Sequence, residues 1–389
     1  MVLKLLDLAQ TQGMRLGLSN MRLLDEAFDY PSTSFASIHV GGTNGKGSTT
    51  LKIASSLSRK RRVGLYTSPH ISTLRERIII DGTMIAHEEM EFFLKKIFKV
   101  TDQKKITPTF FEVLTMLAFL YFREKQVDVA VIEVGMGGRL DATNIITPLL
   151  SIITSISIDH TAHLGKNVEE IAIEKGGIIK ENIPLLLGPQ ASNKKILHRL
   201  AAKKNSPCYV IKGHFEDFEQ ENRGIAKKAL DILGWDIYSY DGLENTPPCR
   251  FEVFVENNNS IILDVAHNPA ALEALVVRLE GHFPGKQAFL IAFSSDKEVE
   301  AMLELLIKKA SFLYLTKASH TRALAPSLVA EYLKKRGYYA YIVEEDIKKC
   351  FERGRREEVL VVTGTFYIMK EVRQALNIEE EKDSVVYPF

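Results

Sequence analysis

The chain has 389 residues, of which 46% are hydrophobic, and its 50 basic and 49 acidic residues leave a formal net charge of +1. This length suits a globular protein of about two domains, and the balance of charge argues against a protein that binds nucleic acid or a membrane surface. Cys208, Cys249 and Cys350 are too few and too scattered for a disulfide framework or a zinc site, so we expect a cytoplasmic protein. The N-terminal stretch lacks a signal-peptide pattern, and no uncharged apolar run reaches the ~20 residues of a membrane span.

Short β-branched runs alternate with amphipathic stretches along the first part of the chain. Strands are predicted over residues 35–40, 62–67, 127–134, 149–157 and 207–213. Between them lie stretches such as residues 112–125, whose apolar positions recur at helical spacing. This order is typical of an α/β fold with a mostly parallel sheet.

The segment 243–250, "LENTPPCR", is polar and carries two consecutive prolines, so it is the best candidate for a linker between domains. Beyond it a hairpin is predicted around residues 257–259. Further strands are predicted over residues 286–293, 311–316, 338–343 and 358–364, with helices between them. We therefore expect a first domain over residues 1–246 and a second, smaller α/β domain over residues 248–389.

The stretch "GGTNGKGST" follows a predicted strand and precedes a predicted helix. Small residues let backbone N–H groups turn inward around an anion, and the start of a helix adds a partial positive charge. Lys46 supplies a cation for the β- and γ-phosphates of a nucleotide, and Ser48 or Thr49 offers a hydroxyl to Mg²⁺. The order G-x-x-G-K-G-S differs from the usual P-loop, G-x-x-x-x-G-K-[ST], by one inserted glycine. An ordinary glycine-rich turn is the alternative, and nucleotide binding is favoured over it.

Three further polar side chains lie at or near the ends of predicted elements. Glu133 lies inside an apolar strand, where a carboxylate is costly unless it binds a metal or is paired, for example with Arg139. His160 follows the next strand, where open α/β sheets place ligands, although spacing alone favours an ordinary loop histidine. Lys175 falls in the last turn of a short predicted helix, where the helix dipole by itself explains a lysine.

The stretch "ILDVAHNPAALEAL", beyond the linker, places Asp264, His267 and Asn268 at a strand end. Pro269 then suits the first turn of a helix. Asp264 and Asn268 are also good helix-capping residues. Arg250, at the entrance to this domain, either reaches a phosphate or lies on the surface.

In this order the motifs resemble those of one family, the folylpolyglutamate synthases and dihydrofolate synthases, which are ATP-dependent ligases related to the Mur ligases. The resemblance runs almost from end to end of the chain, and the joint match is far more specific than any single motif. It is carried by "RLGLSNMRLL", "GGTNGKGST", "TSPHISTLRERIIIDG", "TFFEVLTMLAF", "VIEVGMGGRLDATN", "SISIDHTAHLG", "IAIEKGGIIK", "LDVAHNPAALEAL", "SSDKE" and "VTGTFYIMKEVR". It implies a P-loop domain that binds ATP and folate, followed by a C-terminal α/β ligase domain.

The resemblance also implies the roles of individual residues. ATP would be bound by Thr43, Asn44, Gly45, Lys46, Gly47, Ser48, Thr49, Asn222, Arg250, Asp264, His267 and Asn268. One Mg²⁺ would be bound by Ser68 and Glu133, and a second by His160 and Lys175, a lysine that is commonly carbamylated in this family. Carbamylation turns a cation into an anionic oxygen ligand, which a hard cation prefers. The pterin-bearing substrate would contact Arg15, Leu16, Gly17, Leu18, Thr109, Phe110, Phe111, Glu112, Leu140, Asp141 and Ala142. The implied catalytic residues are Lys46, Glu133, His160 and Lys175.

The implied reaction transfers the γ-phosphate of ATP to a carboxylate of dihydropteroate or of a reduced folate, and the amine of L-glutamate then displaces phosphate. Lys46, two Mg²⁺ ions and Arg250 would stabilise the transferring charge by positioning and electrostatics. The two domains would close over ATP. The resemblance further implies small-molecule partners only, without nucleic acid or membrane, and a cytoplasmic monomer in folate biosynthesis and one-carbon metabolism.

The chain departs from the family pattern at four places. Gly41 and Gly176 stand where alanine is usual, and Val265 stands where glycine is usual. The segment 212–222 is shorter than usual, and Glu219 replaces a histidine of the family there. We expect the sites to survive the three small changes, and the shortened segment to bear on the predicted nucleotide contact at its end.

Three other functions compete with this one. A Mur ligase proper would normally carry a domain of roughly a hundred residues before the phosphate loop, and here we expect none, because 41 residues precede Gly42. A P-loop kinase or GTPase leaves "SIDH", "EKGGI" and "DVAHNP" unexplained. A folate- or nucleotide-binding protein without turnover is compatible with the fold alone, but the full set of predicted catalytic residues argues against it.

Overall fold

The computed structural model describes residues 6, 9, 15–235 and 240–378, and these residues form two compact units. The first unit takes the described residues up to Ser157 and those from Lys166 to Thr246. The second unit takes Ile158–Gly165 and the described residues from Pro247 onward. Within the described residues, the chain passes from the first unit to the second for the last time after Thr246.

One segment lies in a different unit from the one that the sequence predicts. Residues 158–165 fall inside the predicted first domain, 1–246, but they belong to the second unit. The reason is electrostatic, because the buried carboxylate of Asp159 forms an ion pair with Lys297 at 2.8 Å and accepts a hydrogen bond from Asn268 at 3.4 Å. Both partners lie more than a hundred residues away in sequence, so no local pattern indicates the pairing.

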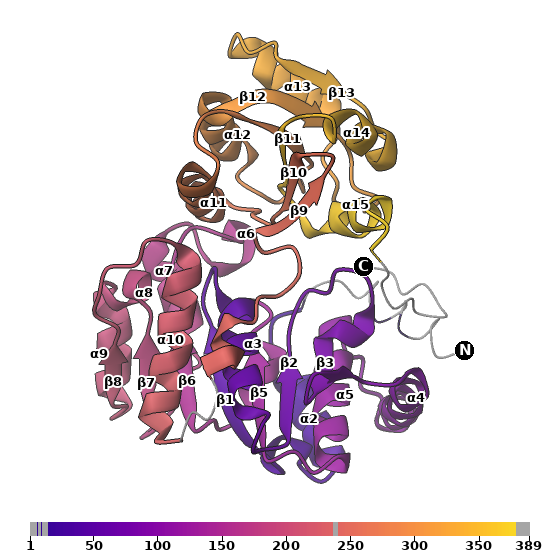
Figure 1. The fold of residues 1–389 in the computed structure, drawn as a ribbon. Helices are drawn as coiled ribbons and strands as arrows, with labels where there is room; N and C mark the ends of the chain where they lie inside the picture. Colours follow the sequence, from indigo (N-terminus) through magenta and orange to yellow (C-terminus); the bar gives the residue numbers. More distant parts are fainter. Residues whose placement is uncertain (1–5, 7–8, 10–14, 236–239, 379–389) are drawn as a thin grey trace. The chain divides into compact units, whose positions relative to one another are not determined.

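The described part of the first unit contains one eight-stranded sheet, in the order β4-β3-β2-β5-β1-β6-β7-β8 (Figure 1). Its strands are β1 (Ala36–Gly41), β2 (Val63–Tyr66), β3 (Ile78–Ile80), β4 (Thr83–Met84), β5 (Val129–Glu133), β6 (Leu150–Ile153), β7 (Leu185–Leu187) and β8 (Cys208–Val210). The six strands β2, β5, β1, β6, β7 and β8 pair in parallel with their neighbours in the sheet. At the other edge, β3 pairs antiparallel with β2, and β4 pairs antiparallel with β3. The predicted α/β fold with a mostly parallel sheet is confirmed. The sequence does not predict β3, β4 and β7, which are runs of two or three residues without apolar–polar alternation.

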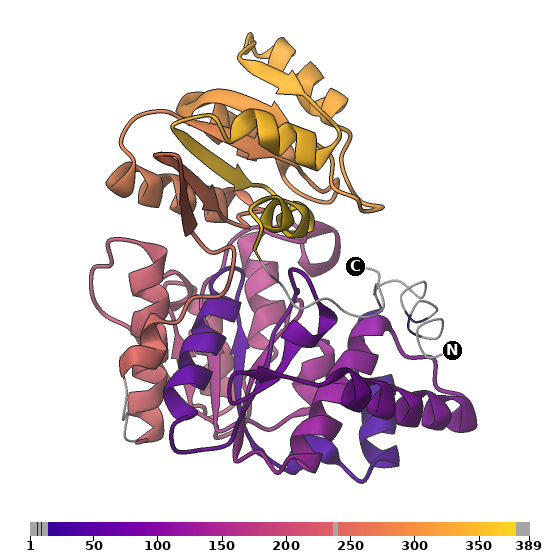
Figure 2. The same cartoon turned by 45° about the vertical axis from the view of Figure 1, so that its right-hand side comes forward.

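Helices cover both faces of this sheet. They are α2 (Ser19–Ala27), α3 (Lys46–Leu57), α4 (His87–Lys104), α5 (Phe110–Glu124), α7 (Val168–Gly176), α8 (Pro189–Ser192), α9 (Lys195–Lys203) and α10 (Phe218–Leu233), with 3-10 turns η1 (Pro31–Thr33), η2 (Leu74–Arg77), η3 (Ala142–Ile145) and η4 (Tyr240–Glu244). Val129 and Val131 of β5 join the buried cluster of α3 and α10, which lie side by side (Figures 1 and 2). Ala130 and Ile132 join the cluster of α5. This alternation is the period of two that a strand covered on both faces requires.

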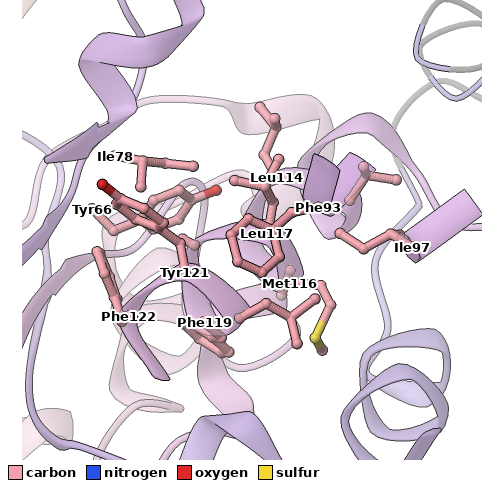
Figure 3. Close-up of a cluster of buried hydrophobic side chains, with 14 of the residues drawn as sticks. Tyr66, Ile78, Phe93, Ile97, Leu114, Met116, Leu117, Phe119, Tyr121 and Phe122 are labelled. Atoms are coloured by element: carbon pink, nitrogen blue, oxygen red, sulfur yellow. The ribbon is translucent and has the colours of Figure 1, made fainter. Parts of the chain in front are cut away.

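Helix α5 is apolar around its whole circumference. All its residues from Glu112 to Phe122 are buried, because α2 and α4 cover what the sheet leaves open. Figure 3 shows side chains of this cluster, in which aromatic and aliphatic residues from β2, β3, α4 and α5 pack together. A helix that is hydrophobic on all sides is stable only when it is enclosed in this way.

The described part of the second unit contains a six-stranded sheet in the order β13-β12-β11-β14-β10-β9, parallel except for β9. Its elements are α6 (Thr161–Leu164), β9 (Glu252–Glu256), β10 (Asn259–Leu263), α11 (Pro269–His282), β11 (Gln287–Ile291), α12 (Val299–Lys309), β12 (Ala310–Leu315), α13 (Pro326–Lys335), β13 (Tyr341–Val343), α14 (Ile347–Gly354), β14 (Val359–Thr363), η5 (Phe366–Ile368) and α15 (Met369–Ala375). The β9–β10 hairpin turns through Asn257 and Asn258, whose φ angles are 51° and 69°, as two-residue hairpin turns prefer. No helix in the described part of the chain is long and apolar enough to cross a membrane.

Replacing Phe119 with alanine tests how far the first unit depends on the cluster around α5. The Phe119 ring is fully buried and packs edge-to-face against Phe35, with ring centroids 5.8 Å apart. Truncation leaves a cavity, so we expect the free energy of unfolding to fall by about 3–5 kcal/mol in urea denaturation followed by circular dichroism. Phe92→Ala removes a ring that is 51% exposed and should change this free energy by about 0.5 kcal/mol or less. Equal losses in the two variants would contradict the assignment of the core.

Candidate active site

The predicted phosphate loop, Ser68 and Glu133 lie at one edge of the sheet of the first unit. In the parallel register, Val40 of β1 pairs with Glu133 of β5, and Gly41 pairs with Ile153 of β6. The loop follows β1, Glu133 ends β5, and Ser68 lies shortly after β2. Because β5 and β6 lie on opposite sides of β1, the chain changes its direction of progress across the sheet here. Open α/β sheets bind ligands at such a point, beyond the carboxyl ends of the strands.

Two glycines allow the tight path of the phosphate loop. Gly42 and Gly45 have φ angles of 140° and 82°, in a region that other residues rarely adopt. A Cβ on Gly42 would lie 2.0 Å from the Thr154 hydroxyl, and a Cβ on Gly45 would lie 2.3 Å from Asn222 Oδ1. Neighbouring groups therefore approach these two positions too closely for any side chain.

The segment that leaves β6 holds the phosphate loop in shape. The N–H of Thr43 donates to the Ser155 carbonyl, and the N–H of Asn44 donates to the Ser155 hydroxyl, both at 2.9 Å. The Thr154 hydroxyl donates to the Asn44 carbonyl at 2.6 Å, and the Ser157 N–H donates to the Thr43 hydroxyl at 3.1 Å. The loop is thus preorganised by bonds from a strand end that lies about a hundred residues away in sequence.

Helix α3 starts directly after this loop. Its first residue is Lys46, and its N-cap is Gly45, which has no side chain to accept from the first-turn N–H groups. This end of the helix therefore favours an anion. The Lys46 ammonium lies over the loop and donates to the Thr43 carbonyl at 3.1 Å. Ser48 and Thr49, in the same turn, are buried beneath the loop. Loop, helix start and ammonium together form a surface suited to phosphate.

Glu133 is a buried carboxylate beside this surface. It is 4% exposed and accepts a hydrogen bond from the Ser68 N–H at 2.9 Å. A Cβ on Gly47 would lie 3.5 Å from Glu133 Oε2, an ordinary van der Waals contact, so the first turn of α3 lies beside the carboxylate. The Arg139 guanidinium, the alternative partner that the sequence suggests, forms its ion pair with Glu174 at 2.8 Å.

Oxygen ligands of this kind fit a hard divalent cation. Mg²⁺ is usually held by one or two carboxylates together with phosphate oxygens and water, rather than by a complete protein cage. The Glu133 carboxylate and the hydroxyl of Ser68, whose N–H donates to that carboxylate, could supply such a partial set. In the ranges that the structure describes, no group of three or more His, Cys, Asp and Glu side chains is arranged to hold a metal ion. A cation here would therefore depend on a bound phosphate.

Lys175 reaches the phosphate loop from α7. Its side chain is 4% exposed, and its ammonium donates to the Gly42 carbonyl at 2.8 Å. It therefore does more than complement the dipole of its own helix. The packing around Gly176, the residue after Lys175, explains why glycine stands there in place of the usual alanine, because a Cβ would lie 2.6 Å from Leu200 Cδ1. Gly41 also stands where alanine is usual, and a Cβ there would lie 3.0 Å from Ile178 Cδ1.

Asn222 lies against the phosphate loop despite the shortened segment before it. It is buried in α10, and the Thr49 hydroxyl donates to its Oδ1 at 3.5 Å. The same oxygen occupies the space beside Gly45. The shortened segment ends at Asp217, which is the N-cap of α10 and accepts a hydrogen bond from the Gln220 N–H.

Three of the residues that are predicted to contact the pterin, Thr109, Glu112 and Asp141, form helix caps through their side chains. Thr109 and Glu112 form a capping box at the start of α5, with the Thr109 N–H donating to Glu112 Oε2 at 2.7 Å. Asn20 donates to the same carboxylate at 3.2 Å, which brings the start of α2, just after the predicted stretch Arg15 to Leu18, to the start of α5. Arg15 and Leu16 are exposed.

The third predicted pterin-contacting stretch, Leu140 to Ala142, meets α5 through a glycine. A Cβ on Gly135 would lie 2.4 Å from the Phe111 ring, and the next residue, Met136, donates its N–H to Asp141 Oδ2 at 2.9 Å. Asp141 caps η3. Burial raises the pKa of its carboxyl, and the hydrogen bonds that it accepts oppose this rise. The structure thus gathers all three stretches around the start of α5.

His39 supports Asp141 from inside the sheet. Its imidazole is fully buried in β1, and its Nε2 lies 2.8 Å from the Thr143 hydroxyl. That hydroxyl donates to Asp141 Oδ1 at 2.5 Å, so geometry assigns the proton to Nε2 of His39. Its Nδ1 has no hydrogen-bond partner among the described residues. Burial, aided by the charge of Lys180, lowers the pKa of His39 to about 3.

The second unit has its own buried charge cluster, which the sequence predicts only in part. Asp159 lies 3.7 Å from His160 Nε2, 3.9 Å from His267 Nε2 and 2.8 Å from the Lys297 ammonium. Burial would raise the pKa of Asp159, but the charges of His160, Lys297 and His267 hold it far below its usual range. Burial lowers the pKa of His267 to about 3. Asp159 and Lys297 are missing from the predicted site residues; only the motifs "SIDH" and "SSDKE" signal them.

The remaining predicted residues of the second unit lie around the end of β10. Asn268 is the N-cap of α11 and accepts from the Ala271 N–H at 2.9 Å. Asp264 accepts from the N–H groups of Phe251 and Ala266, both at 2.9 Å, and burial raises its pKa. The Arg250 guanidinium lies over the Phe366 ring, 5.0 Å from its centroid. Of the four predicted metal-binding residues, Ser68, Glu133 and Lys175 belong to the first unit and His160 to the second.

Comparisons with known proteins relate both units to one group of ligases. Residues 40–217 match the family described as Mur ligase middle domain, and residues 249–366 match the Mur ligase, glutamate ligase domain. The dihydrofolate synthase/folylpolyglutamate synthase of Bacillus subtilis is 30% identical, over 94% of this chain and 96% of that protein. Escherichia coli FolC in complex with DHPP and ADP has a TM-score of 0.86 at 26% identity, over 96% of each chain. The bifunctional Yersinia pestis enzyme, complexed with AMPPNP and Mn ion, has the same TM-score at 28% identity, over 96% of each chain.

Replacing His39 with glutamine tests the buried imidazole through the pH dependence of stability. The folded-state pKa of about 3 lies below the ordinary value of 6.5. Between these values the unfolded chain binds a proton that the folded chain does not, so stability is lost as the pH falls from about 6.5 towards 3. We expect His39→Gln to make this fall shallower by up to ~1.4 kcal/mol per pH unit in urea denaturation between about pH 4 and pH 7. His214→Gln, at an exposed position, is the control, and an unchanged slope in His39→Gln would show that His39 is not buried as a neutral base.

Proposed function

The chain belongs to the folylpolyglutamate synthase/dihydrofolate synthase family of Mur-type ligases, and from that premise we propose that it adds L-glutamate to dihydropteroate, to the glutamyl tail of reduced folates, or to both. The predicted family is confirmed by the relatives and by both family matches. The protein is an ATP-dependent ligase of this family. What remains to be proposed is the acceptor and the role of each residue.

The proposal rests on one observation: a cationic surface and a buried carboxylate lie side by side at one edge of the sheet of the first unit. The phosphate loop and Lys46 offer a cationic surface, and Glu133 offers a buried carboxylate beside it. Lys175 and Asn222 reach the same loop from two further helices. An anion surface next to a hard-cation ligand is the combination that a nucleotide triphosphate requires.

In the proposed reaction, an oxygen of the acceptor carboxylate attacks the γ-phosphorus of ATP, and the bond to ADP breaks. The product is an acyl phosphate. The amine of L-glutamate then attacks its carbonyl carbon, phosphate leaves, and the nitrogen loses a proton to become an amide. Lys46 and the first-turn N–H groups of α3 bind and orient the phosphates, so the protein acts by positioning and electrostatics.

Divalent cations complete this proposal. Glu133 and Ser68 would hold one Mg²⁺, which neutralises charge on the phosphate oxygens. His160 and a carbamylated Lys175 would hold a second, as the family resemblance implies. The solved relative with AMPPNP and a Mn ion supports binding of a divalent cation in this family. The structure of Escherichia coli FolC in complex with DHPP and ADP supports the proposed binding of a nucleotide and of a pterin-bearing acceptor.

The acceptor would lie around the start of α5, where three predicted stretches gather. The capping residues Thr109 and Glu112 fix this corner, and the Asp141 carboxylate lies on its other side. We further propose a cytoplasmic monomer that acts on small molecules, without nucleic acid. The alternatives are another Mur-type amino-acid ligase and a binding protein without turnover. An assay with defined acceptors distinguishes both from the proposed enzyme.

The first test is ADP release by the purified protein with MgATP and L-glutamate. We expect dihydropteroate, tetrahydrofolate or both to stimulate release, and only in the presence of glutamate. Stimulation by dihydropteroate alone identifies a dihydrofolate synthase, and stimulation by tetrahydrofolate alone identifies a polyglutamylating enzyme.

Lys46→Ala should lower kcat at least about 100-fold by removing the phosphate cation, whereas Lys99→Ala, at an exposed position of α4, should not change it. No response to either acceptor would refute the proposed substrates, and near-normal turnover of Lys46→Ala would refute the loop assignment.

Replacing Glu133 with glutamine tests the proposed cation site. The amide keeps the shape of the side chain but loses the charge that attracts Mg²⁺, so we expect the Mg²⁺ concentration for half-maximal ADP binding to rise about tenfold or more. Binding of a fluorescent ADP analogue, titrated with Mg²⁺, measures this without turnover. Glu169→Gln, at an exposed position of α7, is the control. An unchanged titration curve would mean that Glu133 is only structural.

A further inference from the structure

Lys52 is a fully buried lysine in the helix that follows the phosphate loop. Its side chain is 0% exposed, and lysine is almost never fully buried unless its charge is paired. Its ammonium donates to the Glu219 carboxylate, to the Leu243 carbonyl at 2.7 Å and to the Asn245 carbonyl at 3.0 Å. The three donors of the ammonium thus meet three acceptors, all more than 160 residues away in sequence.

Glu219 supplies the negative charge that compensates this buried ammonium. Glu219 is 8% exposed, and its Oε2 has no hydrogen-bond partner in the described residues. The charge of Lys52 is therefore the main compensation for this carboxylate, and the two residues depend on each other.

The ion pair is one of two polar contacts that align α3 with α10. Thr49 and Lys52 are three residues apart on one face of α3, and Glu219 and Asn222 are three residues apart on one face of α10. Thr49 meets Asn222 at 3.5 Å while Lys52 meets Glu219, and the Arg61 guanidinium just past α3 lies 4.4 Å from the centroid of the Trp235 ring just past α10, so the two helices run parallel in a single register. A shift of α10 by one residue would move Asn222 by about 1.5 Å along the helix axis and by about 100° around it.

Of the two residues of α10 that form these contacts, Asn222 is the one that also lies against the phosphate loop. Its Oδ1 lies where a Cβ on Gly45 would come within 2.3 Å. A change in register would therefore either open this contact or drive Asn222 into the loop. Fixing a register is the best-attested use of a buried ion pair, since its net contribution to stability is often small.

We propose that Lys52 and Glu219 are positioning residues of the nucleotide site, whose ion pair sets the register of α10 on α3 and so holds Asn222 against the phosphate loop. The inference rests on the proposed function, in which Asn222 contacts the nucleotide. The Thr246 hydroxyl also donates to Glu219, at 3.3 Å, and Thr246 is the last of the described residues that belong to the first unit. The same buried charge therefore fixes the point at which the chain leaves this unit.

The test separates positioning from stability by replacing the ion pair with apolar side chains. Lys52→Met alone leaves the Glu219 carboxylate buried without its partner, and we expect a lower Tm and weaker binding of MgADP. Lys52→Met combined with Glu219→Met removes both charges at similar volume, so we expect most of the Tm to return. The dissociation constant of MgADP should nevertheless stay about tenfold above that of the wild-type protein, and KM for ATP should rise more than kcat falls.

A cycle with Asn222 tests the route of the effect. Asn222→Ala should weaken MgADP binding to a similar degree, and adding it to the double Met variant should cost no further affinity, because both changes remove one contact. Wild-type affinity in the double Met variant would overturn the proposal and leave the ion pair a stability feature. Independent, multiplying losses would also overturn it, because the pair would then not act through Asn222.

Two controls keep these outcomes distinct. Arg59→Met removes an exposed ion pair with Asp241 at 3.0 Å, which joins the end of α3 to η4, and should change neither Tm nor MgADP binding measurably. If the wild-type protein releases no glutamate-dependent ADP, the proposed function fails. If the wild-type protein turns over while the double Met variant binds MgADP normally, only the positioning role fails.

Discussion

The hydrogen bonds between the phosphate loop and the segment after β6 are the contacts on which the site of the first unit depends. A loop that binds an anion must keep its backbone in one shape without being filled by side chains, so its polar groups need partners from elsewhere. Ser155 and Thr154 supply them at the end of the neighbouring strand. Because β1 lies between β5 and β6, the same geometry brings Glu133 to the opposite side of the loop.

Buried charges arrange the helices around this loop. Lys175 reaches the loop from α7, and Lys52 binds α10 to α3. Each such charge would be strongly destabilising without its partner, and with the partner it admits only one relative placement of the two elements. The second unit follows the same principle with Asp159 and Lys297, and that pair draws a short segment out of the unit in which its neighbours in sequence lie.

The side of the site proposed for the acceptor would join structural and binding roles in the same residues. Thr109 and Glu112 cap α5, and Asp141 caps η3 while a buried, neutral His39 orients its neighbour Thr143. Residues whose hydrogen bonds are satisfied by helix ends hold their rotamers, which suits a site that must fix a substrate carboxylate near a phosphate. Substitutions there will therefore affect stability and binding together, and the two effects have to be measured separately.

The sequence by itself determined the fold class, the longer strands, the β9–β10 hairpin, the helix start at Pro269 and the phosphate loop, because each is written in a run of adjacent residues. It also determined the family, through the order of its motifs. Only the tertiary structure decided the strands β3, β4 and β7, the unit to which residues 158–165 belong, and the partners of Lys52 and Asp159. The partners of Lys52 and Asp159 lie more than a hundred positions away in the sequence, and such contacts leave no periodicity in the local sequence.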